Sequence, residues 1–238
     1  MIKPEDFTAK VIRIDQVNDK VKVLFFECDK DFNYQAGQFV NLKFEDPFGE
    51  QGLIQRAYSI ASVSNGKVFE LCVEIIEGGR GSTYINNLQV GNEVKMKAPF
   101  GFCCIKEDNK NDLVMVGTGT GIAPIKAILE ELAAKNDERR IDVFFGVRHE
   151  TDLFYMEELS DLEANLTNMN LHVTLSQPQS EEWSGLSGRV TTHLEEFDFG
   201  HMPDVYLCGG MAMIKDVMKI AQDNGIERKK IHVEIFDV

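Results

Sequence analysis

The feature that most constrains the fold is a change of pattern along the chain near residue 108. Before it, over residues 7–105, short β-rich runs are broken by turn residues. After it, apolar strand-like runs alternate with helical segments, which is typical of a parallel sheet covered on both faces. We therefore predict two domains: an antiparallel β-barrel over residues 1–108 and an α/β domain with a parallel sheet over residues 109–238.

The expected elements are bounded by Gly, Pro, Asn and Ser, which supply the backbone angles that turns need. In the first domain we expect strands at 8–14, 21–28, 38–44, 57–61, 68–75 and 93–97, and one helix at 82–88. In the second we expect strands at 112–116, 141–146, 171–175, 204–208 and 231–235, and helices at 123–135, 153–164 and 211–224. The polar residues 107–111 suit a linker.

Composition excludes several classes of partner and site. A net charge of -14 argues against a nucleic-acid surface and against docking on an anionic membrane, because both need excess Lys and Arg. The five cysteines show no C-x-x-C spacing, so we expect no disulfide framework and no metal site. The N-terminus lacks a signal-peptide pattern, and no apolar run approaches the roughly 20 residues that span a bilayer. We expect a soluble, cytoplasmic protein.

A glycine-rich turn follows the first strand of the second domain. It contains Gly119, Thr120, Gly121 and Pro124, and it leads into an amphipathic helix. The N–H groups and dipole of that helix favour a pyrophosphate at the carboxyl edge of the sheet. The same turn also fits a tight strand–helix connection with no ligand.

A second glycine pair supports the dinucleotide interpretation. Cys208, Gly209 and Gly210 end another predicted strand and precede another helix, so they would face the same crevice. Cys208 taken alone is more often a small buried hydrophobe than a reactive group.

Six short motifs resemble, in kind and in order, those of the ferredoxin-NADP reductase superfamily, in particular stand-alone bacterial flavin and ferredoxin reductases. They are Arg56-Ala57-Tyr58-Ser59, Gly78 to Thr83, Gly119 to Pro124, Gly146 to Tyr155, Cys208 to Met213, and Glu234-Ile235-Phe236. Together they cover nearly the whole chain and are far more specific than any one of them. Two positions depart from the pattern: Thr118 stands where many members have glycine, and Met211 where many have proline.

The resemblance implies that the first domain binds FAD. Arg56 would pair with the FAD pyrophosphate, Tyr58 would pack on the isoalloxazine, and Ser59 would lie near flavin N5. Ala57 belongs to the same motif. The alternatives are a surface cation for Arg56, a core-facing ring for Tyr58 and strand-end hydrogen bonding for Ser59.

A second FAD-binding segment is implied further along the first domain. Gly81, Ser82 and Thr83 open the expected helix and would hold the flavin phosphates. An ordinary helix cap is the alternative. Glu74 and Ile75 match positions where the family's main chain meets the flavin.

For the second domain the resemblance implies a nicotinamide dinucleotide site. The residues it assigns to the pyrophosphate and the surrounding groove are Gly119, Thr120, Gly121, Pro124, Gly146, Arg148, Asp152, Ser176, Gln177, Gly209, Gly210 and Met213. Arg148 could equally form a surface ion pair with Glu150 or Asp152, which would contribute below about 1 kcal/mol.

Three residues are implied at the site of hydride transfer, together with one that covers the flavin. Cys208 and Glu234 would lie by the nicotinamide and Ser59 by the flavin, and we assign these three as catalytic. Phe236 would cover one flavin face. The alternatives are an edge-strand surface carboxylate for Glu234 and a core side chain for Phe236.

The segment after the third strand of the second domain bears on the choice of dinucleotide. Members that use NADPH commonly carry a basic residue there, which pairs with the 2′-phosphate. Residues 174–182 hold no Lys or Arg, and Glu181 and Glu182 are acidic. NADH is therefore favoured over NADPH, although the distant Arg189 could reach back.

The resemblance implies hydride transfer from NAD(P)H to bound FAD and electron release to a separate acceptor. That acceptor would be a ferredoxin, a flavodoxin, an oxygenase component or free flavin. A free-flavin reductase, an electron-transfer subunit and a non-catalytic redox-sensing module remain alternatives. The acidic chain would repel an acidic ferredoxin unless Lys20, Lys22 or Arg80 forms a local basic patch.

Overall fold

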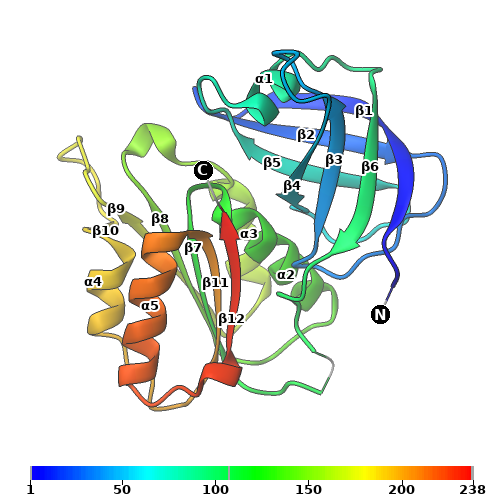
Figure 1. Cartoon of the computed structure of the whole chain (residues 1–238). Helices are drawn as coiled ribbons and strands as arrows, with labels where there is room; N and C mark the ends of the chain where they lie inside the picture. The colour runs from blue at the N-terminus through cyan, green and yellow to red at the C-terminus, as the bar shows by residue number, and fades with distance from the viewer. Residues whose placement is uncertain (1, 107, 237–238) are drawn as a thin grey trace. The chain divides into compact units, whose positions relative to one another are not determined.

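The computed structural model describes residues 2–106 and 108–236, so Glu107 of the expected linker lies outside the described residues. Contacts divide the chain into two compact units, Met1–Cys104 and Ile105–Val238. Each unit has its own sheet, as Figure 1 shows.

The first unit is a six-stranded antiparallel sheet in the order β4-β3-β6-β1-β2-β5. Its elements are β1 (Glu5–Gln16), β2 (Val21–Cys28), β3 (Phe39–Glu45), β4 (Leu53–Ser59), β5 (Val68–Glu74), α1 (Arg80–Asn86) and β6 (Glu93–Phe100). Just beyond β4, Ile60 forms an antiparallel bridge with Leu71 of β5. This bridge joins the two outer strands, which confirms the antiparallel barrel predicted from the sequence.

The barrel closes around one apolar core. Val11, Leu42 and Met96 come from three different strands and are all fully buried, as the period-2 alternation of these strands requires. Phe26 and Phe69 stack inside it with ring centroids 5.4 Å apart.

The second unit is a parallel sheet in the order β10-β9-β8-β7-β11-β12. Its strands are β7 (Leu113–Thr118), β8 (Ile141–Val147), β9 (Met169–Leu175), β10 (Leu186–Ser187), β11 (Asp204–Gly210) and β12 (Ile231–Phe236). Its helices are α2 (Ile122–Ala134), α3 (Met156–Asn165), α4 (Val190–Glu195) and α5 (Met211–Asp223). Figure 1 shows α2 and α3 on one face and α4 and α5 on the other, which confirms the predicted α/β fold.

The order of these strands determines where a ligand can bind. The chain runs outward from β7 through β8 to β9, then returns to β11 on the other side of β7. In sheets of this kind the crevice lies at the carboxyl ends of the two strands where the direction reverses, here β7 and β11. Among the described helices, none is long and apolar enough to cross a membrane.

Several boundaries differ from the sequence prediction. β4 begins at Leu53 rather than 57, because only Ile54 is buried in its first half and the apolar signal is weak there. α3 begins at Met156 rather than 153, because Tyr155 has a left-handed backbone with φ 58°. The two-residue β10 and the six-residue α4 were not predicted.

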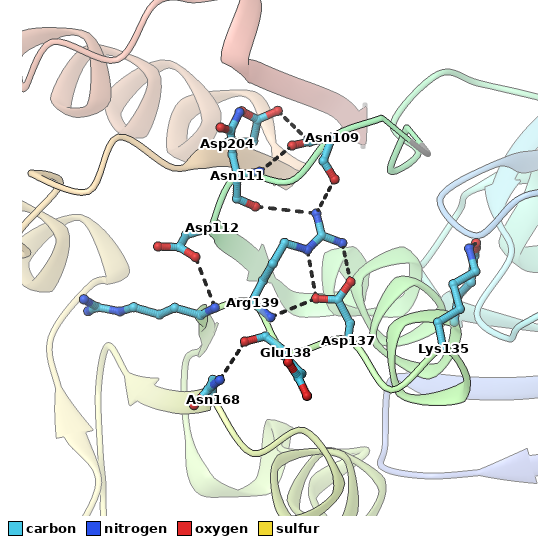
Figure 2. Close-up of polar contacts among 11 residues, drawn as sticks. Asn109, Asn111, Asp112, Lys135, Asp137, Glu138, Arg139, Asn168 and Asp204 are labelled. Atoms are coloured by element: carbon cyan, nitrogen blue, oxygen red, sulfur yellow. Dashed lines mark hydrogen bonds and ion pairs between the residues drawn. The ribbon is translucent and has the colours of Figure 1, made fainter.

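A hydrogen-bond network holds the start of the second unit against the amino ends of its strands (Figure 2). The Asp204 carboxylate accepts hydrogen bonds from Asn109 Nδ2 and Asn111 Nδ2, both at 2.8 Å. Arg139 Nη1 donates to the Asn109 carbonyl at 3.1 Å, and its Nη2 pairs with Asp137 at 2.7 Å. This edge of the sheet is therefore fixed by polar contacts, opposite the edge expected to bind ligand.

Candidate functional site

In the first unit, β4 and the start of α1 approach each other closely. Arg56 and Tyr58 are two residues apart on β4 and so project from the same face of the strand. A Cβ atom at Gly81 would overlap Tyr58 Oη and would lie 3.4 Å from Arg56 Cγ. Only glycine therefore allows the helix to begin against these two side chains.

The turn that leads into α1 is held by one hydroxyl. Ser82 Oγ accepts a hydrogen bond from the Ile76 N–H at 2.9 Å and donates to the Glu74 carbonyl at 3.4 Å. The N–H of Thr83 donates to the Gly79 carbonyl at 2.8 Å. The side chain of Ser82 thus fixes the segment that runs from the end of β5 to α1.

The remaining residues of the β4 motif differ in exposure. Ser59 is buried, with 7% of its surface exposed, and pairs with Phe39 of β3, whereas Ala57 and Arg56 are exposed. Burial raises the pKa of Tyr58 to about 12, against the opposing effect of Arg56, so its phenol is neutral at physiological pH. The unit thus presents a permanent cation, a neutral aromatic ring and a glycine at one place.

In the second unit, the glycine-rich turn lies directly against the end of β11. Residues Gly119–Gly121 form a short 3-10 helix between β7 and α2. A Cβ atom at Gly121 would collide with the main-chain carbonyl of Cys208. The start of α2 and the end of β11 therefore meet where the strand order reverses, as the sequence pattern predicts.

The strands on either side of this turn bring further predicted residues together. Cys208 is fully buried and lies opposite Glu234 on the neighbouring β12. A Cβ atom at Gly209 would lie 2.5 Å from Thr118 Oγ1 and 3.1 Å from Met213 Cε. By register, Gly209 then pairs with Ile235, and Gly210 pairs with Phe236 at the end of the two strands.

The connections that follow β8 and β9 are joined by main-chain hydrogen bonds. The Ser176 N–H donates to the Val147 carbonyl at 3.0 Å, and the Gln177 N–H donates to the Arg148 carbonyl at 2.9 Å. The Asp152 carboxylate accepts from the His149 N–H at 3.1 Å. Arg148, Ser176 and Gln177 therefore lie together at the carboxyl edge, and Asp152 lies in the same connection as Arg148.

One predicted groove residue has a packing role in the structure. A Cβ atom at Gly146 would lie 2.6 Å from Val190 Cγ1 of α4, so glycine is needed for the helix to pack on β8. The predicted catalytic residues belong to different units: Ser59 to the first, and Cys208 and Glu234 to the second.

The sequence did not predict that Glu150 joins the connections that follow β8 and β9. From the sequence, Glu150 was an alternative ion-pair partner for Arg148. In the structure, its carboxylate accepts hydrogen bonds from the N–H groups of Gln179 and Ser180. Both partners are main-chain groups distant in sequence, and such contacts leave no residue signature. The one available signal was an acid three residues after the end of the second strand.

Comparisons with known proteins agree with this two-unit arrangement. Residues 8–104 match the oxidoreductase FAD-binding domain, and residues 115–219 match the oxidoreductase NAD-binding domain. Ferredoxin–NADP reductase B of Sorangium cellulosum (strain So ce56) is 33% identical over 248 residues, which cover 100% of both chains.

Two further matches are to parts of longer proteins. The phenol hydroxylase P5 protein of Acinetobacter pittii (strain PHEA-2) is 27% identical over 98% of this chain and 66% of its own length. The crystal structure of an Amycolatopsis cytochrome P450 reductase matches with a TM-score of 0.87 at 25% identity, over 98% of this chain and 70% of that one.

The fit of the residues and the domain matches agree on the ligands. The first unit offers a cation, an aromatic ring and a close glycine, and the second offers a glycine-rich helix start at the carboxyl edge of a parallel sheet. The protein is an oxidoreductase that uses FAD and NAD(P)H. The chain belongs to the ferredoxin-NADP reductase superfamily.

Proposed function

We propose that this chain takes a hydride from NAD(P)H, with NADH favoured, onto FAD and passes the electrons to a separate acceptor in the cytoplasm. The acceptor is a ferredoxin, a flavodoxin or an oxygenase component. The observation that carries the proposal is the end-to-end match, at 33% identity, with a protein named ferredoxin–NADP reductase. When bound, flavin supplies the chemistry that connects a two-electron donor to one-electron acceptors.

In the first unit the proposed roles follow from charge and shape. Arg56 is exposed and permanently charged, so its planar guanidinium suits the FAD pyrophosphate. Tyr58 offers a neutral ring for packing against the flavin. Ser59 supplies a hydroxyl that can donate or accept a hydrogen bond as the flavin changes redox state.

The turn into α1 completes the proposed FAD site. Because Ser82 Oγ is engaged in holding the turn, the phosphates would be met mainly by main-chain N–H groups of Gly81 and its neighbours and by Thr83. Glu74 and Ile75, at the end of β5, would contribute main-chain contacts to the flavin.

In the second unit the start of α2 would bind the dinucleotide pyrophosphate. Thr120 and Gly121 precede a 13-residue helix whose free N–H groups favour an anion. Pro124 lies in the first turn, where its missing N–H costs nothing. Arg148, Asp152, Ser176 and Gln177 would border the groove.

The end of β11 would orient the nicotinamide. The Cys208 side chain is fully buried, which suits a packing and orienting role rather than covalent catalysis. Glu234 would hold its carboxylate beside it, from the neighbouring strand. The floor of the nicotinamide site would be formed by Gly209, Gly210 and Met213. Phe236 would cover the flavin.

The test is the absorbance spectrum of the purified protein during anaerobic addition of NADH and, separately, NADPH. We expect oxidised-flavin bands that bleach, followed by reoxidation when a ferredoxin, a flavodoxin or an oxygenase component is added. A colourless protein that cannot be reconstituted with FAD would overturn the proposal. Reduction of added free flavin alone would instead support the free-flavin reductase.

A further inference from the structure

The second unit has the strand order of a dinucleotide-binding sheet, and this order indicates where the adenosine half of the ligand binds. Counted along the chain, its five long strands lie in the order third, second, first, fourth, fifth. In sheets of this order the glycine turn follows the first strand, and an acid after the second strand meets the adenosine ribose. Here the second strand is β8, and the residues that follow it are Arg148 to Asp152.

Glu150 lies in that connection and reaches across to the connection that follows β9. Its Oε1 accepts hydrogen bonds from the Gln179 N–H at 3.0 Å and the Ser180 N–H at 2.9 Å, and its Oε2 accepts from the Gln179 N–H at 3.1 Å. Hydrogen bonds from the main chain, first that of Ser180, lower the pKa of Glu150. The carboxylate is therefore charged at neutral pH.

The two connections are also joined beside Glu150. His149 Nδ1 donates to the Gln177 carbonyl at 2.6 Å, and the Gln177 N–H donates to the Arg148 carbonyl at 2.9 Å. Figure 1 shows both connections leaving the same edge of the sheet. Glu150 is thus held in one place rather than swinging freely in solvent.

Two consecutive main-chain N–H groups directed at one point are a common way to bind a phosphate. Here those of Gln179 and Ser180 already hold a carboxylate. A 2′-phosphate carries a charge of roughly -1.5 to -2 at neutral pH and would have to displace Glu150 or lie against its charge. Residues 176–182 offer no Lys or Arg in compensation. A ribose 2′-hydroxyl, in contrast, can donate a hydrogen bond to a carboxylate.

We infer that Glu150 is a specificity-determining residue, which admits the 2′-hydroxyl of NADH and rejects the 2′-phosphate of NADPH by occupying the main-chain donors of the facing connection. This inference rests on the proposed function for its biological meaning. It predicts a difference in binding that does not require turnover.

The test compares Glu150→Gln with the wild type, using adenosine 2′,5′-bisphosphate and AMP as probes in isothermal titration calorimetry on the flavin-loaded protein. Glutamine keeps the shape and one acceptor but removes the charge. We expect binding of the bisphosphate to strengthen about tenfold, or ~1.4 kcal/mol, and binding of AMP to change less than about threefold. The ratio of kcat/KM for NADPH to that for NADH should rise in parallel.

Two further variants separate charge from structure. Glu181→Gln removes the same charge from an exposed carboxylate of the same loop, and we expect both affinities to stay within about twofold of wild type. Glu150→Asp shortens the side chain but keeps the charge, so it should still reject the bisphosphate. If Glu150→Asp instead gains bisphosphate affinity as Glu150→Gln does, Glu150 merely supports the loop and the inference is wrong.

The outcomes for the inference and for the proposed function are distinct. If neither NADH nor NADPH bleaches the flavin, the proposed function is wrong, and the ratio of bisphosphate affinity to AMP affinity still tests the role of Glu150. Bleaching by NADH together with an unchanged bisphosphate-to-AMP ratio in Glu150→Gln would overturn the inference alone.

Discussion

Gly81 and Gly121 mark positions where main chain and side chains come closer than a methyl group allows. At Gly81 the obstructing atom is the hydroxyl oxygen of Tyr58, and the next nearest atom is Arg56 Cγ at 3.4 Å. We expect Gly81→Ala to displace Tyr58 and to lower the bound flavin per protein chain at least about tenfold. The ratio of flavin to protein absorbance after gel filtration measures this.

A double variant identifies the cause of that loss. Because the overlap is with Tyr58 Oη, Tyr58→Phe removes the obstructing atom, and the combination Gly81→Ala with Tyr58→Phe should regain much of the flavin that Gly81→Ala loses. Tyr58→Phe alone is the matched control. No recovery in the double variant would show that Gly81 matters for a reason other than this contact.

Asp142 on β8 provides a pH-dependent prediction. Only 2% of its side chain is exposed, and it accepts hydrogen bonds from Arg140 Nε at 2.8 Å and His172 Nε2 at 3.1 Å. Burial opposes its ionisation, but the hydrogen bonds from His172 and Arg140 outweigh burial and hold its pKa below the usual 3.8. The ionised carboxylate therefore stabilises the fold above about pH 4, and this contribution is lost as pH falls through the lowered pKa.

We expect Asp142→Asn to lower the free energy of unfolding by about 2 kcal/mol near neutral pH, because charged hydrogen bonds are lost. The difference from wild type should shrink as the pH approaches about 3. Urea unfolding followed by circular dichroism at both pH values measures it, with the exposed Asp161→Asn as control. A difference that is the same at both pH values would contradict the assigned charge state.

At the scale of elements, most of the fold could be predicted because the signals are local. β2 was predicted over residues 21–28 and lies there, since apolar periodicity and flanking turn residues determine it within a few positions. The six-residue α4 was not predicted, because it contains Thr191 and Thr192 and is supported by tertiary packing of Val190 on Gly146.

The parts of the site that the sequence indicated are likewise those with local signals. The glycine turns were found because their backbone requirements leave a residue signature, as at Gly121. The hydrogen bonds that the Glu150 carboxylate accepts could not be predicted, because the donors are main-chain N–H groups, which nearly every residue carries.

The contacts of Asp204 with Asn109 and Asn111 anchor the start of the second unit at the amino ends of its strands. Asp204→Asn removes the charged acceptor for the side chains of Asn109 and Asn111. Hydrogen bonds to a charged group are worth about 1.5–3 kcal/mol each, so local opening of residues 108–112 should increase at least about tenfold. Trypsin cleavage after the exposed Lys110, followed by mass spectrometry, measures this opening.

Asp108→Asn is the matched control for this anchor, because Asp108 is an exposed acid of the same segment. We expect it to leave the cleavage rate within about twofold of wild type. Equal acceleration in both variants would mean that the net charge of the segment, rather than the contacts of Asp204, protects Lys110.

At the scale of the whole molecule, net charge bears on the encounter with the proposed electron acceptor. The chain carries a net charge of -14, and Arg80, one candidate for a basic patch, is paired with Asp46 at 3.2 Å and with Glu50. Lys22, a second candidate, donates to Asn86 at 2.7 Å. Little cationic charge is therefore left at Arg80 to attract an acidic acceptor.

We expect reduction of a basic protein probe, cytochrome c, to slow as NaCl rises from about 0.01 M to about 0.3 M, because salt screens the attraction. Reduction of an acidic ferredoxin should accelerate over the same range, because salt screens the repulsion. Initial rates under saturating NADH measure both. A ferredoxin rate that falls with salt would show that a basic patch outweighs the net charge at the docking surface.

The two edges of the second sheet serve separate purposes. Because all its strands run in parallel, the segment that enters from the first unit is anchored by Asp204 at one edge, and the loops proposed to face the nucleotide leave from the other. The 6 residues of β7 and the 7 of β11 lie between them. The segment that joins the two units can therefore change in length, or be fused to another module, without altering the loops proposed to bind the dinucleotide.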